Sequence, residues 1–180
     1  MPSQPRTAKP TKKVDQTEAA SENRLIDDIH DLVAAVELEN VAFYEERGRR
    51  VTWTDEERDS LDFPLYANSL GVVHTDNSLS FRFRMVFTDE NAEYVSDVAA
   101  EYSIPEQVVV DDQVQLEFAE RVAFMTVYPY MRASIFGSAV RLGQPAPILA
   151  IVRPGDFKAG DAMTDEEARA AFFDAVSERG

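Results

Sequence analysis

The chain contains no cysteine and only two histidines and seven glycines among its 180 residues. The absence of cysteine excludes a disulfide-stabilised scaffold, a zinc site built on thiolates and a thiol nucleophile. His30 and His74 lie far apart in the sequence without a second set of ligands, so neither a metal centre nor any other cofactor is expected. A glycine-rich phosphate loop and a nucleophile elbow are also missing, and the sequence gives no positive support for catalysis.

Basic residues are scarce: 18 stand against 33 acidic ones, and the formal net charge is −15. Four of the 18 fall within the first 14 residues, so the remainder has 14 basic against 33 acidic residues, a net of about −19. A chain with this negative charge outside its first 14 residues should repel nucleic acid and anionic membranes, and its natural partners are basic or apolar. Carboxylate pairs such as Glu45–Glu46 and Asp111–Asp112 follow from this composition, and we interpret them as solvated surface.

Long hydrophobic runs are absent, since no stretch approaches the roughly 18 apolar residues of a membrane-spanning helix. The basic N-terminal segment also lacks the apolar stretch of a signal peptide, so we expect a cytoplasmic protein without membrane insertion. Residues 1–20 are rich in proline, lysine, threonine and serine, which predicts a disordered basic tail. Residues 21–180 are expected to form a single domain whose core needs no metal or disulfide.

Strands are predicted in the first half of that domain. A helical pattern over residues 21–35 precedes a strand over 36–46 and a charged loop over 49–62. Three further strands are predicted over 64–74, 79–88 and 92–104, joined by turn sequences at 75–78 and 88–91, although the alanines of the last also permit a helix. In the strand over 79–88, Leu79, Phe81, Phe83, Met85 and Phe87 alternate with wetter residues, so one face is apolar.

Helices follow the strands. A helical pattern begins at Asp112 and ends at a glycine cap, Gly143, with an interruption at Pro129 that should kink the helix or restart it. An extended apolar segment over 145–154 leads to a final helix that begins at a capping box, Thr164 with Glu167. This order predicts an α+β fold, a four-stranded antiparallel meander sheet with helices packed on one face.

Apolar and aromatic side chains are abundant, with 11 phenylalanines, six tyrosines and five methionines. Such side chains suit adaptable binding surfaces. The alternating strand face could equally be the core of the domain, covered by its helices. Both interpretations hold together if the apolar surface exceeds what one domain covers, in which case the surplus would face a copy of the chain or a partner.

The stretch VAFMTVYPYMRASIFGSAVRLGQPAPILAIVRPGDF, residues 122–157, resembles the SecB family of cytosolic chaperones. A helix of that family carries an aromatic–Pro–Tyr–x–Arg core, matched here by Tyr128, Pro129, Tyr130 and Arg132. The glycine, proline and apolar positions that follow are matched by Gly143, Pro145, Ile148, Leu149 and Ile151. The close resemblance covers about residues 112–157, and a looser one covers about 35–178.

This resemblance implies a SecB-like homotetramer, a dimer of dimers, that holds unfolded polypeptides without ATP and is not an enzyme. Clients are preproteins passed to the ATPase SecA in most of the family, and an antitoxin in a solitary branch. The N-terminal extension, the charged insert and the C-terminal ending depart from the usual pattern, which puts SecA in doubt and favours the antitoxin branch. The expected client-binding groove consists of Phe81, Phe83, Met85, Phe124, Tyr128, Tyr130 and Ile148.

Two other hypotheses remain. The chain could be a structural protein that self-assembles without binding clients, in which case it would form an oligomer with no affinity for unfolded chains. It could also be an enzyme on the same architecture, which a bound cofactor or metal would indicate.

Overall fold

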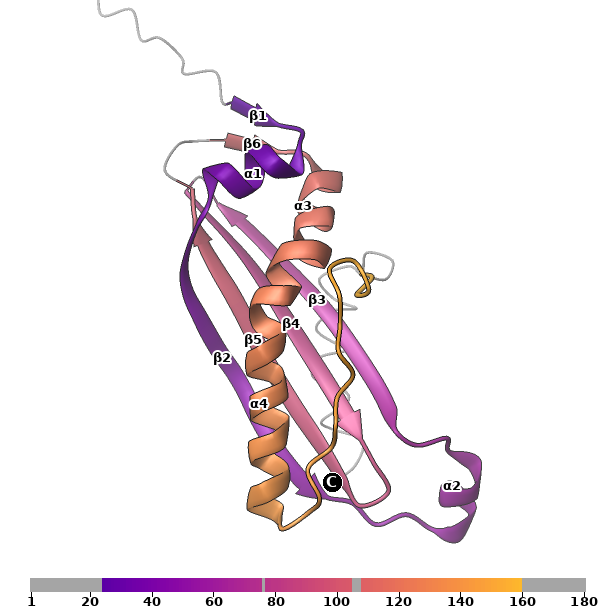
Figure 1. Cartoon of the computed structure of the whole chain (residues 1–180). Helices are drawn as coiled ribbons and strands as arrows, with labels where there is room; N and C mark the ends of the chain where they lie inside the picture. The colour runs from indigo at the N-terminus through magenta and orange to yellow at the C-terminus, as the bar shows by residue number, and fades with distance from the viewer. Residues whose placement is uncertain (1–23, 76, 105–107, 160–180) are drawn as a thin grey trace, which may run out of the picture.

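The computed structural model describes residues 24–75, 77–104 and 108–159, and shows a four-stranded antiparallel sheet with helices on one face (Figure 1). The strands run in the order β2, β5, β4, β3 across the sheet, and their bounds are β2 Glu37–Arg50, β3 Leu65–Thr75, β4 Ser78–Thr88 and β5 Ala92–Ser103. The predicted α+β class and antiparallel sheet are confirmed.

Short polar turns make β3, β4 and β5 successive hairpins. The Asp89 carboxylate accepts hydrogen bonds from the backbone N–H groups of Asn91 and Ala92, both at 2.8 Å, and closes the β4–β5 turn. Strand β2 pairs with β5, so residues 51–64 connect the two edges of the sheet. The loop predicted over 49–62 is only partly correct, because β2 continues to Arg50 and helix α2 (Asp55–Ser60) follows, begun by a Thr54–Glu57 capping box.

The helix predicted over 21–35 is wrong in its first half. Residues Arg24–Ile26 form strand β1, which pairs in parallel with β6 (Val108–Val110), a strand that the sequence pattern did not reveal. Helix α1 covers Ile29–Ala35, and its N-cap is Asp28, whose carboxylate accepts from the His30 N–H at 2.7 Å. The pairing partner of β1 is distant in sequence, and that non-local pairing overrides the local helical spacing.

One long helix crosses the sheet, built from α3 (Asp112–Phe118), a π-helical turn η1 (Ala119–Ala123) and α4 (Phe124–Leu142). The prediction of a restart at Pro129 is wrong, because Pro129 lies inside α4 and the helix continues through it. The irregularity lies earlier, at η1, and such π-helical turns are frequent at functional sites. The helix ends as predicted at Gly143, whose φ of 66° is left-handed.

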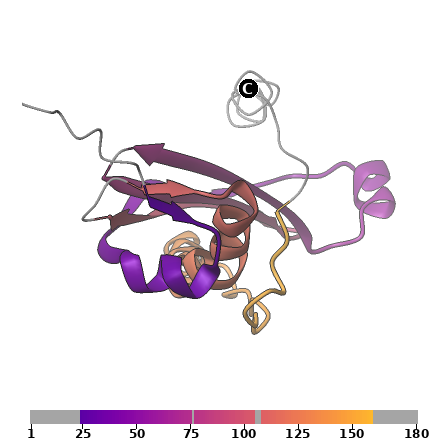
Figure 2. The same ribbon diagram turned by 90° about the horizontal axis from the view of Figure 1, so that it is seen from above.

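The core lies between the sheet and this helix, and Figure 2 shows α1, α3 and α4 on the same side of the sheet. The alternating apolar residues of β4, which are Leu79, Phe81, Phe83, Met85 and Phe87, face this core, and none of them is more than 5% exposed. Helix α4 approaches β2 closely at Gly48, where a Cβ atom would lie 3.1 Å from Leu142 and from Ser138. A larger residue at Gly48 would force the helix away from the sheet.

After Gly143 the chain runs back along the long helix without forming a helix or strand of its own (Figure 1). We call residues 144–159 the strap. The tail predicted over 1–20 and the helix predicted from Thr164 lie outside the described residues. Within the described ranges, no helix is both long and apolar enough to cross a membrane.

Candidate functional site

The residues predicted to line a client groove separate into two groups. Five of them are at most 6% exposed and lie in the core under the long helix and the strap: Phe81, Phe83, Met85, Phe124 and Tyr128. Tyr130 is 46% exposed, and it contacts Phe43 of β2 rather than the strap. Ile148 is 94% exposed on the strap itself. The structure therefore does not join all seven residues in one open groove.

The strap covers the aromatic cluster through Phe157. The Phe157 ring stacks on Phe124 of α4, with centroids 4.4 Å apart, and meets the edge of Phe83 of β4 at 5.5 Å. Further back along the strap, Leu149 is buried against the core at 4% exposure. The end of the strap, which turns at residues 153–156, thus places an aromatic side chain of the chain itself between the long helix and the sheet.

Polar contacts fasten the strap at two places. The Tyr128 hydroxyl donates a hydrogen bond to the Ala150 carbonyl, and burial raises the pKa of this tyrosine above its ordinary value. Glu120 in the π-helical turn accepts from Lys158 Nζ at 2.7 Å and from the Ala159 N–H at 3.1 Å. The half-exposed ion pair contributes about 1 kcal/mol or less, so the strap is held only weakly by charge.

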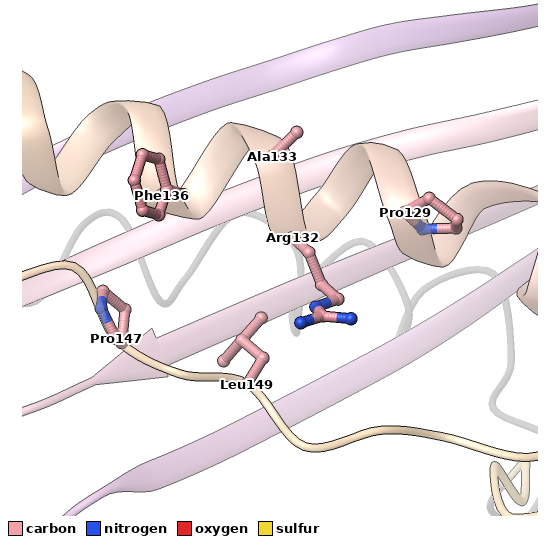
Figure 3. Close-up of a pocket in the computed structure, with 6 residues that line it drawn as sticks. All are labelled: Pro129, Arg132, Ala133, Phe136, Pro147 and Leu149. Atoms are coloured by element: carbon pink, nitrogen blue, oxygen red, sulfur yellow. The ribbon is translucent and has the colours of Figure 1, made fainter.

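Depressions border the strap along its length. One of about 320 Å³ lies between α4 and the beginning of the strap (Figure 3). Another, of about 400 Å³, lies between α1, η1 and Pro154, and its lining is mostly apolar, with Ile29, Val33 and Val122. The strap contributes Pro147 and Leu149 to the first depression and Pro154 to the second.

The opposite face of the sheet carries a network of charged side chains. Arg82 Nε and Nη2 donate to the two Asp97 oxygens at 2.7 Å each, and Arg84 contacts both Asp97 and Glu45. Asp97 is fully buried, and Arg82 also lies 4.0 Å above the Tyr44 ring. These groups satisfy one another across β2, β5 and β4, so the arrangement fixes the register of the strands.

Neither histidine belongs to the groove. His30 lies on α1, where its ring hydrogen-bonds Asp28 at 3.1 Å, and His74 lies near the end of β3. In the ranges that the structure covers, no three His, Cys, Asp or Glu side chains are placed to hold a metal ion together.

The sequence did not single out Phe157, Glu120 or Lys158. Phe157 could have been noticed, because it is an aromatic residue that stands three positions after an apolar segment bounded by prolines. Glu120 and Lys158 are 38 residues apart, and both resemble ordinary surface charges in the sequence. Their contact follows only from the return of the strap to the π-helical turn.

Comparisons with known proteins found matches in sequence and in structure, whereas no family model matches the chain. The chain is 32% identical over 141 residues to the SecB-like chaperone SmegB of Mycolicibacterium smegmatis, covering 78% of this chain and 92% of the relative. The Mycobacterium tuberculosis SecB-like chaperone Rv1957, solved in complex with a ChAD peptide from the Rv1956 HigA1 antitoxin, is similar with a TM-score of 0.54 and 13% identity, over 68% of this chain and 95% of that one. A Streptococcus agalactiae protein of unknown function gives a TM-score of 0.46 and 10% identity, over 64% and 97%.

Proposed function

The chain belongs to the family of SecB-like chaperones, and from this premise we propose that it holds unfolded or extended polypeptides without ATP. The observation that carries the proposal is the strap, because its Phe157, placed just after a turn, already packs against Phe83 and Phe124. A client segment with an aromatic or large apolar side chain would fit the same place. The lack of a glycine-rich phosphate loop supports a mechanism without nucleotide and without catalysis.

Clients reach this groove when the end of the strap around Phe157 moves away, while the beginning of the strap stays against α4. Phe83 and Phe124 contact Phe157 and would be uncovered by that movement, whereas Tyr128 keeps its hydrogen bond to Ala150. Phe81 instead stacks on Phe118 at 5.3 Å, deeper under α3, where it supports the fold. The burial of a phenylalanine side chain is worth about 1.5–3 kcal/mol, so a client aromatic can replace Phe157 at little net cost.

The class of client follows from the charge and from the relatives. An acidic surface attracts basic unfolded segments and keeps an apolar groove soluble. Rv1957, the similar fold, was captured with an antitoxin peptide. Together with the departures of the sequence from the usual SecB pattern, this supports an antitoxin as client over a preprotein destined for SecA.

Copies of the chain are proposed to associate through α4 and the edge strand β2. The outer side of α4 exposes Tyr130 and Val140 by 46% and 57%, and among the described residues β2 pairs only with β5 along its 14 residues. Exposed apolar side chains beside an unpaired strand edge are typical of a self-association surface. This surface supports the dimer of dimers that the family resemblance implies.

Sedimentation tests this assembly. The wild-type chain of 20.2 kDa is expected to sediment as a tetramer, and Val140→Asp is expected to yield smaller species, because the charge would be buried between copies. Val73→Asp is the matched control, since Val73 is 62% exposed on β3, away from α4. A wild-type monomer at micromolar concentration would contradict the assembly.

The holding activity is tested with an unfolded, aggregation-prone client in the absence of nucleotide. The wild type is expected to suppress light scattering at near-stoichiometric ratios. Phe124→Leu keeps the groove apolar but removes the stacking surface under Phe157, so weaker suppression by a folded variant is expected. An oligomer that neither binds the client nor suppresses scattering would support the alternative, a self-assembling structural protein.

A further inference from the structure

The depression between α4 and the beginning of the strap combines an apolar wall with a single cation. Its lining consists of Pro129, Arg132, Ala133, Phe136, Pro147 and Leu149. Figure 3 shows the Arg132 side chain extending from the helix toward the strap, with Leu149 and Pro147 on the opposite wall. At about 320 Å³ the depression has room for one large side chain.

Arg132 differs from its neighbours on the long helix in having no carboxylate partner within the described ranges. Arg121 pairs with Glu117, and Arg141 pairs with Glu46. Among the described residues, the Arg132 guanidinium lies over the Tyr128 ring, 5.8 Å from its centroid. In a chain with 33 acidic residues, a guanidinium left without a carboxylate beside an apolar wall is available to an anion from outside.

The strap holds this guanidinium in place indirectly. Because the Tyr128 hydroxyl donates to the Ala150 carbonyl, the orientation of the Tyr128 ring is fixed by the strap. A guanidinium above an aromatic face keeps its N–H groups free at the edge, where they can bind a carboxylate through two parallel hydrogen bonds. The pocket is thus prepared for a carboxylate before a ligand arrives.

We propose that this pocket selects client segments in which a large apolar side chain stands next to an aspartate or glutamate. The apolar side chain would lie between Phe136, Pro147 and Leu149, and the neighbouring carboxylate would bind Arg132. Elsewhere the strongly acidic chain repels carboxylates, so Arg132 creates one place at which a client segment with a carboxylate is preferred. The inference rests on the proposed function, because it assigns a specificity determinant to the same client groove.

Two matched peptides test the preference. Both are extended, N-acetylated and C-amidated, so that only a side chain can be anionic, and they differ in carrying Leu-Asp or Leu-Asn at the centre. Fluorescence anisotropy is expected to show the Leu-Asp peptide bound about fivefold more tightly by the wild type, as for a partly exposed ion pair. The preference is expected to vanish in Arg132→Gln and to return in part in Arg132→Lys.

Arg153→Gln is the control, because Arg153 is an exposed strap residue outside the pocket, and its removal changes the net charge equally. This variant should keep the fivefold preference. Equal binding of both peptides by the wild type would overturn the inference. It would also be overturned if Arg132→Gln changed the sedimentation of the protein but kept the preference for the Leu-Asp peptide, because the pocket would then serve contacts between copies. If neither peptide binds but unfolded clients still do, the proposed pocket is refuted. If unfolded clients do not bind either, the proposed holding function itself is refuted.

Discussion

Replacement of Asp97 by alanine is expected to destabilise the fold by about 3–5 kcal/mol, as for a buried ion pair that loses one partner. Asp97 is fully buried on β5 and accepts two hydrogen bonds of 2.7 Å from Arg82. Arg84, only 7% exposed, also contacts this carboxylate and would be left with Glu45 alone. The loss should appear as a lower urea midpoint with an unchanged slope.

Glu101→Ala is the matched control on the same strand. Glu101 accepts a hydrogen bond of 3.0 Å from Asn40 on β2, but this contact is exposed, so a change within about 0.5 kcal/mol is expected. If Asp97→Ala unfolds at the same urea concentration as Glu101→Ala, the charged face does not hold the strands in register. The stability of the sheet would then come from contacts other than this ion-pair network.

A covalent lock on the strap is expected to reduce client affinity at least tenfold. Because the client is proposed to replace Phe157 against Phe83 and Phe124, it cannot bind there while the Phe157 end of the strap stays in place. Glu120 and Lys158 are suitable positions, since their side chains already meet at 2.7 Å and the chain has no native cysteine. The double variant Glu120→Cys/Lys158→Cys can be joined by a short, cleavable thiol cross-linker.

The control for the lock is a cross-link that leaves the strap free. Thr75→Cys/Ser78→Cys places both thiols at the β3–β4 hairpin, where the two native hydroxyls lie 2.6 Å apart. This cross-linked protein should bind clients like the wild type. The uncross-linked Glu120→Cys/Lys158→Cys protein should bind at least as tightly as the wild type, because the fastening of the strap has been removed.

Most of the sheet was predictable from the sequence because neighbouring residues along the chain determine its strands and turns. The strict alternation over 79–88 and the turn residues on each side of it define the β3–β4–β5 hairpins. The parallel pair of Arg24–Ile26 with Val108–Val110 was missed, because neither three-residue segment carries a pattern of its own and the two meet only in the folded chain. The same limit explains why Leu25 and Ile26 were assigned to a helix.

For the site, only the apolar and aromatic character of its side chains could be predicted from the sequence. The alternating phenylalanines were open to two interpretations, core or binding face, and the structure places Phe81 and Phe83 in the core of a single chain. What decides access to Phe83 is the strap, whose Phe157 contacts it from 74 positions further along the sequence. Periodicity along one element cannot show which distant segment covers that element, or whether the cover can be displaced.

The measurement that tests the central claim most directly is the affinity of the strap-locked protein for an unfolded client, before and after the cross-linker is cleaved in the same sample. The account predicts that binding is at least tenfold weaker with the Glu120→Cys/Lys158→Cys cross-link in place, and that cleavage restores it. Equal affinity before and after cleavage would contradict the account, because a client would then bind without entering the groove under the strap.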